Sequence, residues 1–185
     1  MRTSMVHALF AVAVGSVACT SNNSGPQTAY QATLNNAYVV PADTSTGTAS
    51  LTLTVSGTSV TGTLTIGGAP SNNGVATTYS VGHIHQGSAG ANGAILLNLC
   101  GTAAVAAAGN NPGQAATPAC TPGAAVPISF TAPQLSSAMP GSAGAETFSA
   151  FVTQIEAEGD YVQIHSAAHP AGEIRGQITR TLQSF

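Results

Sequence analysis

Two neighbouring stretches of alternating residues, 49–57 and 59–68, constrain the fold more than any other feature of the chain. In both, leucine, valine or isoleucine stands at most second positions, with threonine or serine mainly between them. Because successive side chains of a strand point to opposite faces, this pattern places apolar groups on one face and hydroxyls on the other. Gly57 and polar neighbours end the first stretch, and they predict a hairpin between the two.

Further short stretches with the composition of strands recur along the chain, separated by residues typical of turns. They lie at residues 28–35, 76–87, 93–99, 125–132, 159–166 and 172–180. The segment 146–157 fits a strand or a helix, and a single helical turn is expected near residues 133–139. We therefore predict an all-β fold, an antiparallel β-sandwich or Greek-key barrel of about eight strands with at most one short helical turn.

The low charge of the chain excludes several classes of function. Only 5% of the residues are charged, with three basic against six acidic residues. Binding to a nucleic-acid backbone relies on clustered positive charge, so we expect no nucleic-acid partner. No Gly-x-Ser-x-Gly motif, phosphate-binding loop or dinucleotide fingerprint is present. Glu156, Glu158 and Asp160 form an acidic run that we assign to a solvated turn and not to the paired carboxylates of a glycoside hydrolase. Without any of these catalytic patterns, enzymatic activity is not the expected role.

The N-terminus has the features of an export signal. Arg2 precedes an apolar run from Ala8 to Ala18, which is too short to span a bilayer as a helix. The small residues before Cys19 resemble a bacterial lipobox, in which that cysteine becomes lipidated and N-terminal. We predict a lipoprotein signal peptide over residues 1–18, lipidation at Cys19 and membrane attachment through the lipid. Ordinary secretion after cleavage and a retained anchor are the alternatives.

The rest of the chain is expected to form one domain behind a tether. Residues 19–27 are polar and contain glycine and proline, which is typical of a flexible linker. The β domain would then cover residues 28–185. The predicted location is the cell envelope or cell surface for a lipoprotein, and the exterior for a secreted protein.

The chain has three cysteines, and two of them remain if Cys19 carries lipid. Export to an oxidising compartment favours a disulfide between Cys100 and Cys120. Closing a loop of this length contributes roughly 3 kcal/mol to stability. The alternative is a thiolate metal site, although no histidine stands near the pair with ligand spacing.

Histidines supply the candidate metal site. His83 and His85 are two residues apart on a predicted strand and share a face, together with Tyr79 and Val81. His165 ends another strand and His169 lies in the following turn, so all four imidazoles meet if the two strands are neighbours.

Two interpretations of these histidines remain open. A cluster of neutral imidazoles suits copper or zinc, so His83, His85, His165 and His169 are candidate ligands. Alternatively, each ring donates to a loop carbonyl and holds the glycine-rich loop 87–93 or the turn 167–172 in place.

Glu173 and Arg175 are also two residues apart, and they are expected to share a strand face. Arg175 can form a charge-assisted pair with Glu173 or with Asp160, or clamp a loop near the end of the sheet. The alternative is that Arg175 contacts an anionic ligand beside the histidines.

Three stretches of the sequence resemble the CHRD family, named for the domain repeated in chordin. They are YQATLNNAYVVPADTSTGTASLTL, GHIHQGSAGANGAILLNL and GDYVQIHSAAHPAGEIRGQI. The resemblance covers roughly residues 28–180, and the third stretch is its most specific part. An insertion between Leu99 and Val126, which carries both cysteines, departs from the family pattern. The resemblance implies an all-β fold and export.

Together these features predict an exported, lipid-anchored CHRD-like module with a non-catalytic binding or structural role at the cell envelope. Its partner would be a protein or another envelope component. One alternative is copper or zinc binding, with redox chemistry, through the histidine cluster. Another is a surface adhesion or matrix protein that uses its threonine-rich sheet faces for contact.

Overall fold

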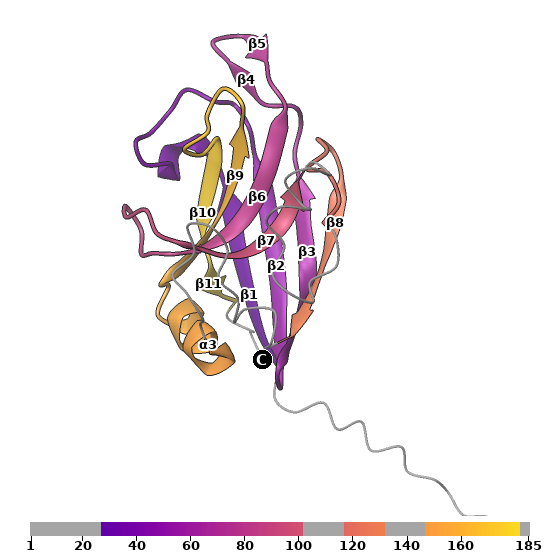
Figure 1. The fold of residues 1–185 in the computed structure, drawn as a ribbon, viewed down its shortest axis with the longest axis vertical. Helices are drawn as coiled ribbons and strands as arrows, with labels where there is room; N and C mark the ends of the chain where they lie inside the picture. The colour runs from indigo at the N-terminus through magenta and orange to yellow at the C-terminus, as the bar shows by residue number, and fades with distance from the viewer. Residues whose placement is uncertain (1–26, 102–116, 132–146, 182–185) are drawn as a thin grey trace, which may run out of the picture.

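The computed structural model describes residues 27–101, 117–131 and 147–181, which form two antiparallel sheets packed face to face (Figure 1). The first sheet has the strand order β11-β1-β2-β3-β8, with β1 (Gln27–Leu34), β2 (Ala49–Ser56), β3 (Ser59–Ile66), β8 (Ala125–Thr131) and β11 (Thr179–Arg180). The second has the order β10-β9-β6-β7, with β6 (Tyr79–Gln86), β7 (Ile95–Gly101), β9 (Asp160–Ser166) and β10 (Ile174–Gln177). The short strands β4 (Ser71–Asn72) and β5 (Val75–Ala76) pair at one end.

The hairpin of β2 and β3 shows how the alternating sequence builds the core. In its register Leu51 lies opposite Leu64, and both side chains are buried. The intervening threonines, such as Thr52 opposite Thr63, lie on the outer face of the sheet. Gly57 begins the turn with a φ of +58°, a conformation that glycine adopts without a steric penalty. The predicted hairpin is confirmed.

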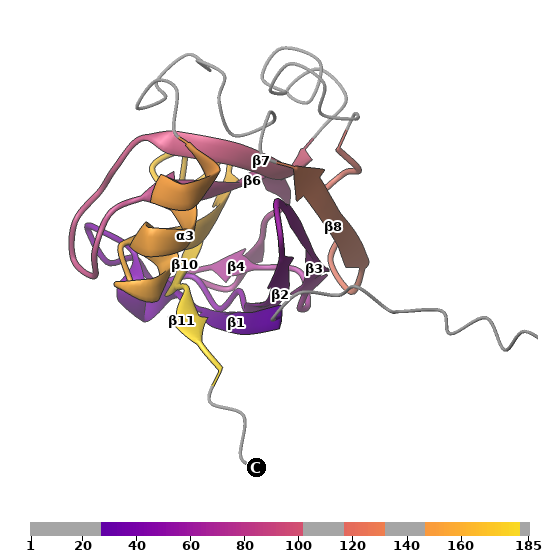
Figure 2. The ribbon, with the colours of Figure 1, turned by 90° about the horizontal axis from the view of Figure 1, so that it is seen from below.

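The helix α3 (Phe148–Glu156) resolves the ambiguous segment 146–157 as helical. The side chain of Thr147 caps it by accepting a hydrogen bond from the Ala150 amide. Figure 2 shows α3 at one side of the two sheets, between β7 and β11. Its residues Phe151 and Ile155 are buried in the shared core. The 3-10 helix η1 (Asn36–Tyr38) follows β1.

The predicted all-β sandwich is confirmed, and the strands that the structure describes do not close into a barrel. The helical turn expected near 133–139 lies outside the described residues. So do the predicted signal peptide, Cys19, nearly all of the predicted tether and most of the segment between the two other cysteines. No helix within the described ranges has the length and apolar character needed to cross a bilayer.

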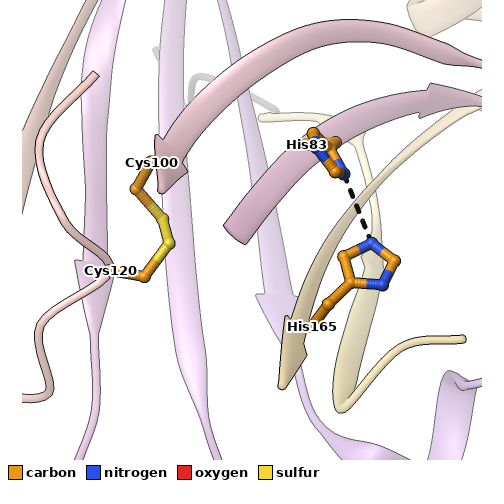
Figure 3. Close-up of a disulfide and its surroundings, with 4 residues drawn as sticks. All are labelled: His83, Cys100, Cys120 and His165. Carbon is orange, nitrogen blue, oxygen red and sulfur yellow. Dashed lines mark hydrogen bonds between the residues drawn. A yellow bond between two sulfur atoms is a disulfide. The ribbon is translucent and has the colours of Figure 1, made fainter. Parts of the chain in front are cut away.

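The structure joins Cys100 and Cys120 in a disulfide (Figure 3). Cys100 lies near the end of the edge strand β7, and Cys120 lies in the segment that leads into β8, an edge strand of the other sheet, so the bond connects the two sides. Both residues are buried in the core. Gly82 of β6 makes room for the bond, because a Cβ there would lie 2.9 Å from the Cys100 sulfur.

One part of the acidic run differs from its expected place. Glu156 and Glu158 are exposed, as a solvated turn requires, but Asp160 is fully buried. The reason is that Asp160 already belongs to β9, where its backbone carbonyl accepts from the Ile178 amide.

Candidate functional site

His83, His85 and His165 converge on the outer face of the second sheet. In the antiparallel register of β6 and β9, His85 lies opposite Tyr161, and His165 lies opposite Val81. The residues between them, such as Ile84 and Ile164, face the core. Each histidine offers one ring nitrogen to a group in which all three nitrogens lie within 4.8 Å of one another.

Hydrogen bonds fix the orientation of these rings. His85 Nδ1 is 3.0 Å from the Gly93 carbonyl oxygen, and His165 Nδ1 is 3.0 Å from that of Pro170. Because a carbonyl oxygen only accepts, both Nδ1 atoms donate and both Nε2 atoms keep a lone pair. His83 Nδ1 lies 3.3 Å from His165 Nε2 (Figure 3), so the Nδ1–H of His83 donates there.

The Nε2 atom of His85 differs from the other ring nitrogens of this bonded set. It is buried and has no hydrogen-bond partner within the described part of the chain. A buried acceptor without a partner costs free energy, so such an atom calls for a reason. Its position beside two other imidazoles suggests a ligand atom.

Burial keeps the three rings neutral. It is the largest cause that lowers the pKa of His83 to about 3, and the neighbouring His165 and His85 lower this pKa further. Burial also lowers the pKa of His85 to about 4, against the opposing effect of its bond to Gly93. The pKa of His165 is lowered too, again by burial first. Neutral imidazole is the form that binds a metal ion.

His169 does not join this group, which corrects the expected set of four ligands. Its Nδ1 lies 3.3 Å from a carboxylate oxygen of Asp43, and its backbone carbonyl accepts from the Ser166 and Gly172 amides. The turn after β9 therefore directs His169 towards the segment that follows η1, away from the other three histidines.

Tyr79 also departs from its expected face. The pairing of β6 with β9 is irregular between Tyr79 and Val81, and this shift places Tyr79 in the core. Burial, followed by the negative charge of Glu173, raises the pKa of Tyr79 to about 12.

Tyr161 is a site residue that the sequence pattern did not single out for the cluster. Its ring stacks on His85, with centroids 4.9 Å apart and an interplanar angle of 7°. Its hydroxyl oxygen accepts from the Gly93 amide, 3.0 Å away. Tyr161 thus holds both the His85 ring and the loop whose carbonyl orients that ring. The signal that could have found it is cross-strand pairing, which needs the register of β6 and β9.

Arg175 clamps the loop 87–93 from β10. Its guanidinium lies 3.4 Å from the centroid of the Tyr161 ring, a cation–π contact. Its Nη2 donates to the Ser88 carbonyl at 3.0 Å, and its Nη1 donates to the Asn92 side-chain oxygen at 3.3 Å. These contacts match the expectation that Arg175 holds a loop near the end of the sheet.

The ion pair suggested between Arg175 and Glu173 is not formed among the residues that the structure describes. Glu173 is fully buried and accepts hydrogen bonds from the hydroxyls of Ser45 and Ser166 instead. The physical reason is that β10 begins only at Ile174, so Glu173 precedes the strand and does not follow its alternation.

A separate pocket of about 440 Å³ lies between β1, η1 and the loop 87–93. None of the three clustered histidines lines it, whereas Arg175 and Gln177 do. Tyr38, which is largely exposed, contributes an aromatic wall. The pocket and the histidine cluster therefore share Arg175 and its loop as a boundary.

One of three comparisons with known proteins identifies the family of this chain. A family model for the CHRD domain matches residues 30–178, which include the disulfide and the three histidines. Comparison with curated proteins gave no match, and comparison with solved structures gave none either. The matched range starts within β1 and ends just after β10, so it spans both sheets. The chain belongs to the CHRD domain family.

Proposed function

We propose that this CHRD domain is exported, anchored by a lipid on Cys19, and acts as a non-catalytic binding module at the cell envelope. The observation that supports the non-catalytic role is that polar side chains on the second sheet form hydrogen bonds to the protein's own loops. His85, His165 and Arg175 each donate to a backbone carbonyl in a loop. An acid–base pair would instead need such groups to point at a substrate.

These contacts support a role in presenting loops. The glycine-rich loop 87–93 has few side chains with which to hold itself, yet it is tied to β6, β9 and β10. The turn 167–172 is held in the same way by His165 and Gln163. Two fixed loops reduce the conformational entropy that is lost when a partner binds, which favours recognition.

Export is supported by the leader sequence and by the disulfide. Disulfides persist in oxidising compartments and are rare in reducing ones. The pair Cys100–Cys120 has its sulfur atoms packed in the core, so it serves a structural purpose. The apolar run before Cys19 supplies the targeting signal that such a compartment requires.

Lipid attachment is tested by labelling the full chain with a fatty-acid analogue during expression in a bacterial host. We expect label in the membrane fraction, and its loss with release of the protein in Cys19→Ser. The matched control is Cys120→Ser, which removes a cysteine of the domain and should keep the label. Equal labelling of the Cys19→Ser variant, or no label on the unaltered chain, would contradict the anchor.

Partner binding through the loops is tested by site-specific photo-crosslinking in the same cells. A photoreactive residue at the exposed position Ala91, within the loop 87–93, should give a discrete crosslinked product. The control position is Thr52, which is exposed on the outer face of the other sheet. No product from Ala91, or the same product from both positions, argues against recognition by this loop.

A further inference from the structure

We infer that His83, His85 and His165 form a binding site for one copper or zinc ion on the outer face of the second sheet. The inference goes beyond loop presentation, because it concerns the ring nitrogens that the loops leave free. It rests on three observations, which are the convergence of the nitrogens, the partners of the opposite ring atoms and the unpartnered Nε2 of His85.

The hydrogen bonds determine which atoms would bind the ion. His85 and His165 use Nδ1 for the carbonyls of Gly93 and Pro170, so each would bind through Nε2. His83 directs Nδ1 at the same point, where it meets His165 Nε2. With the ion bound, His83 carries its proton on Nε2, a change of tautomer that releases no net proton.

The distances suit a tetrahedral ion. Zn–N distances of about 2.0–2.1 Å place two ligand nitrogens about 3.3–3.4 Å apart. His83 Nδ1 and His165 Nε2 are already 3.3 Å apart. The three nitrogens of the group lie within 4.8 Å of one another, so the wider separations must shorten when an ion binds. Small rotations of the rings can bring the nitrogens closer by this amount.

The surroundings have the form of an outer coordination shell. Metal-binding histidines almost always donate their second ring nitrogen to a carbonyl or carboxylate, which fixes tautomer and orientation. Gly93 and Pro170 fill this role for two of the three rings. Stacking against Tyr161 further restricts the His85 ring. The shell is therefore formed before any ion arrives.

The ion would enter from the side of His165. His83 and His85 are only 7% and 6% exposed, whereas His165 is intermediate in exposure. A site with three protein ligands and one accessible direction leaves a fourth position for water or an external ligand.

The chemistry of the donors selects the ion. The group consists of imidazoles, which suit copper and zinc better than magnesium or calcium. Affinities at such sites generally rise from zinc to copper(II). Arg175 lies near enough for its positive charge to lower the pKa of His85, and the same charge weakens the binding of any cation. The order of affinities leads us to expect tighter binding of copper(II) than of zinc, while the charge of Arg175 weakens the binding of both.

The test is a titration of the full chain, purified without a polyhistidine tag and stripped with a chelator, with copper(II) and then with zinc. We expect one ion per chain, and an electron paramagnetic resonance spectrum of the copper form with nitrogen hyperfine structure. His165→Gln and His83→Gln should each lower the copper affinity by at least about 100-fold. The matched control is His169→Gln, which removes a described histidine outside the cluster and should bind as the unaltered chain does.

Several results would overturn the site. These are no stoichiometric binding at micromolar copper, a spectrum without nitrogen ligands, or an equal loss of affinity in His169→Gln. The spectrum of the unaltered chain decides the matter even if a cluster variant does not fold. Thermal unfolding of each variant, with and without copper, separates loss of ligands from loss of fold. Copper should raise the midpoint of the unaltered chain and leave that of a folded His165→Gln variant unchanged.

Discussion

At the scale of the residue, two of the three clustered histidines, His85 and His165, use their two ring nitrogens for different purposes. One nitrogen of His85 and of His165 secures a loop, and the other faces the cluster. Burial that favours packing also keeps the rings neutral, as the lowered pKa values of His83 and His85 indicate. Structural and ligand roles are therefore compatible in one residue, and the two interpretations of the sequence need not exclude each other.

The lowered pKa values predict a loss of stability in mild acid when no metal is bound. A histidine in the unfolded chain has a pKa of about 6.5, so it becomes protonated below this pH. The buried rings of the folded chain stay neutral there, and protonation therefore stabilises the unfolded state relative to the folded state. The free energy of unfolding is highest above pH 6.5 and falls as the pH drops towards about 4, the value for His85. His83 and His85 should each contribute a loss of about 1 kcal/mol between about pH 7 and about pH 5.5.

Urea unfolding in a chelating buffer at these two pH values measures the effect. His85→Gln removes one of the responsible groups, so its stability should depend less steeply on pH than that of the unaltered chain. A free energy of unfolding that stays constant or rises in acid would contradict the burial of neutral rings.

Tyr161 supports the cluster through its hydroxyl as well as its ring. Tyr161→Phe keeps the stacking on His85 and removes the acceptor for the Gly93 amide, so we expect a loss of about 1 kcal/mol in unfolding free energy. Because Gly93 also orients His85, copper affinity should fall by roughly 10-fold. Calorimetry and copper titration measure the two effects. The control is Tyr38→Phe, an exposed position outside the cluster, and similar losses there would refute the assignment.

The candidate ligands were predictable in part, for reasons that lie in local geometry. A His-x-His spacing on a strand places both rings on one face whatever the partner strand is, so His83 and His85 could be paired from sequence. His169 could not be placed, because its direction depends on the turn after β9 and on Asp43, which is far away in sequence. Tyr161 and the loop carbonyls depend on strand register and loop path, which one sequence does not specify.

At the scale of the element, strands were easier to predict than the helix. The alternation in β2 and β3 directly reports a half-buried strand, whereas the segment 146–157 has apolar residues that fit either period. Capping by Thr147 and burial of Phe151 and Ile155 favour the helix, and this burial depends on the fold around it. The irregular pairing of β6 with β9 near Tyr79 could not be predicted either, because a shift in strand pairing does not change the alternation of apolar and polar residues in the sequence.

Gly62 tests the packing of β3 against β2. A Cβ built there would lie 1.9 Å from the Thr52 carbonyl oxygen, a backbone atom that cannot move without disturbing the sheet. We expect Gly62→Ala to lower the unfolding free energy by about 1–3 kcal/mol, the usual range for overpacking. The control is Gly68→Ala, where a Cβ would meet no atom within 4 Å. Urea unfolding of both variants checks this, and an equal effect of the two substitutions would show that the close approach is absent in solution.

At the scale of the whole molecule, the two sheets are joined by a shared core and by one covalent bond. Alternation in the strands predicts two apolar faces that must be buried, but it suits a sandwich and a barrel equally. The choice depends on which strands pair at the edges, and β7 and β8 belong to different sheets here. The disulfide bridges this open side, since Cys100 belongs to β7 and Cys120 shortly precedes β8.

Removal of the disulfide should therefore destabilise the whole sandwich without changing the histidine cluster. For a sequence separation of 20 residues, the lost restriction of the unfolded chain corresponds to about 3 kcal/mol. The double variant Cys100→Ala/Cys120→Ala should show this loss in urea unfolding, and Cys19→Ser should not. Copper binding of the folded double variant should be preserved, because the sulfur atoms lie in the core and the histidines on the opposite face of β6. A loss well below 1 kcal/mol would mean that side-chain packing alone holds the open side, whereas loss of copper binding in a folded variant would mean that the edge controls the cluster.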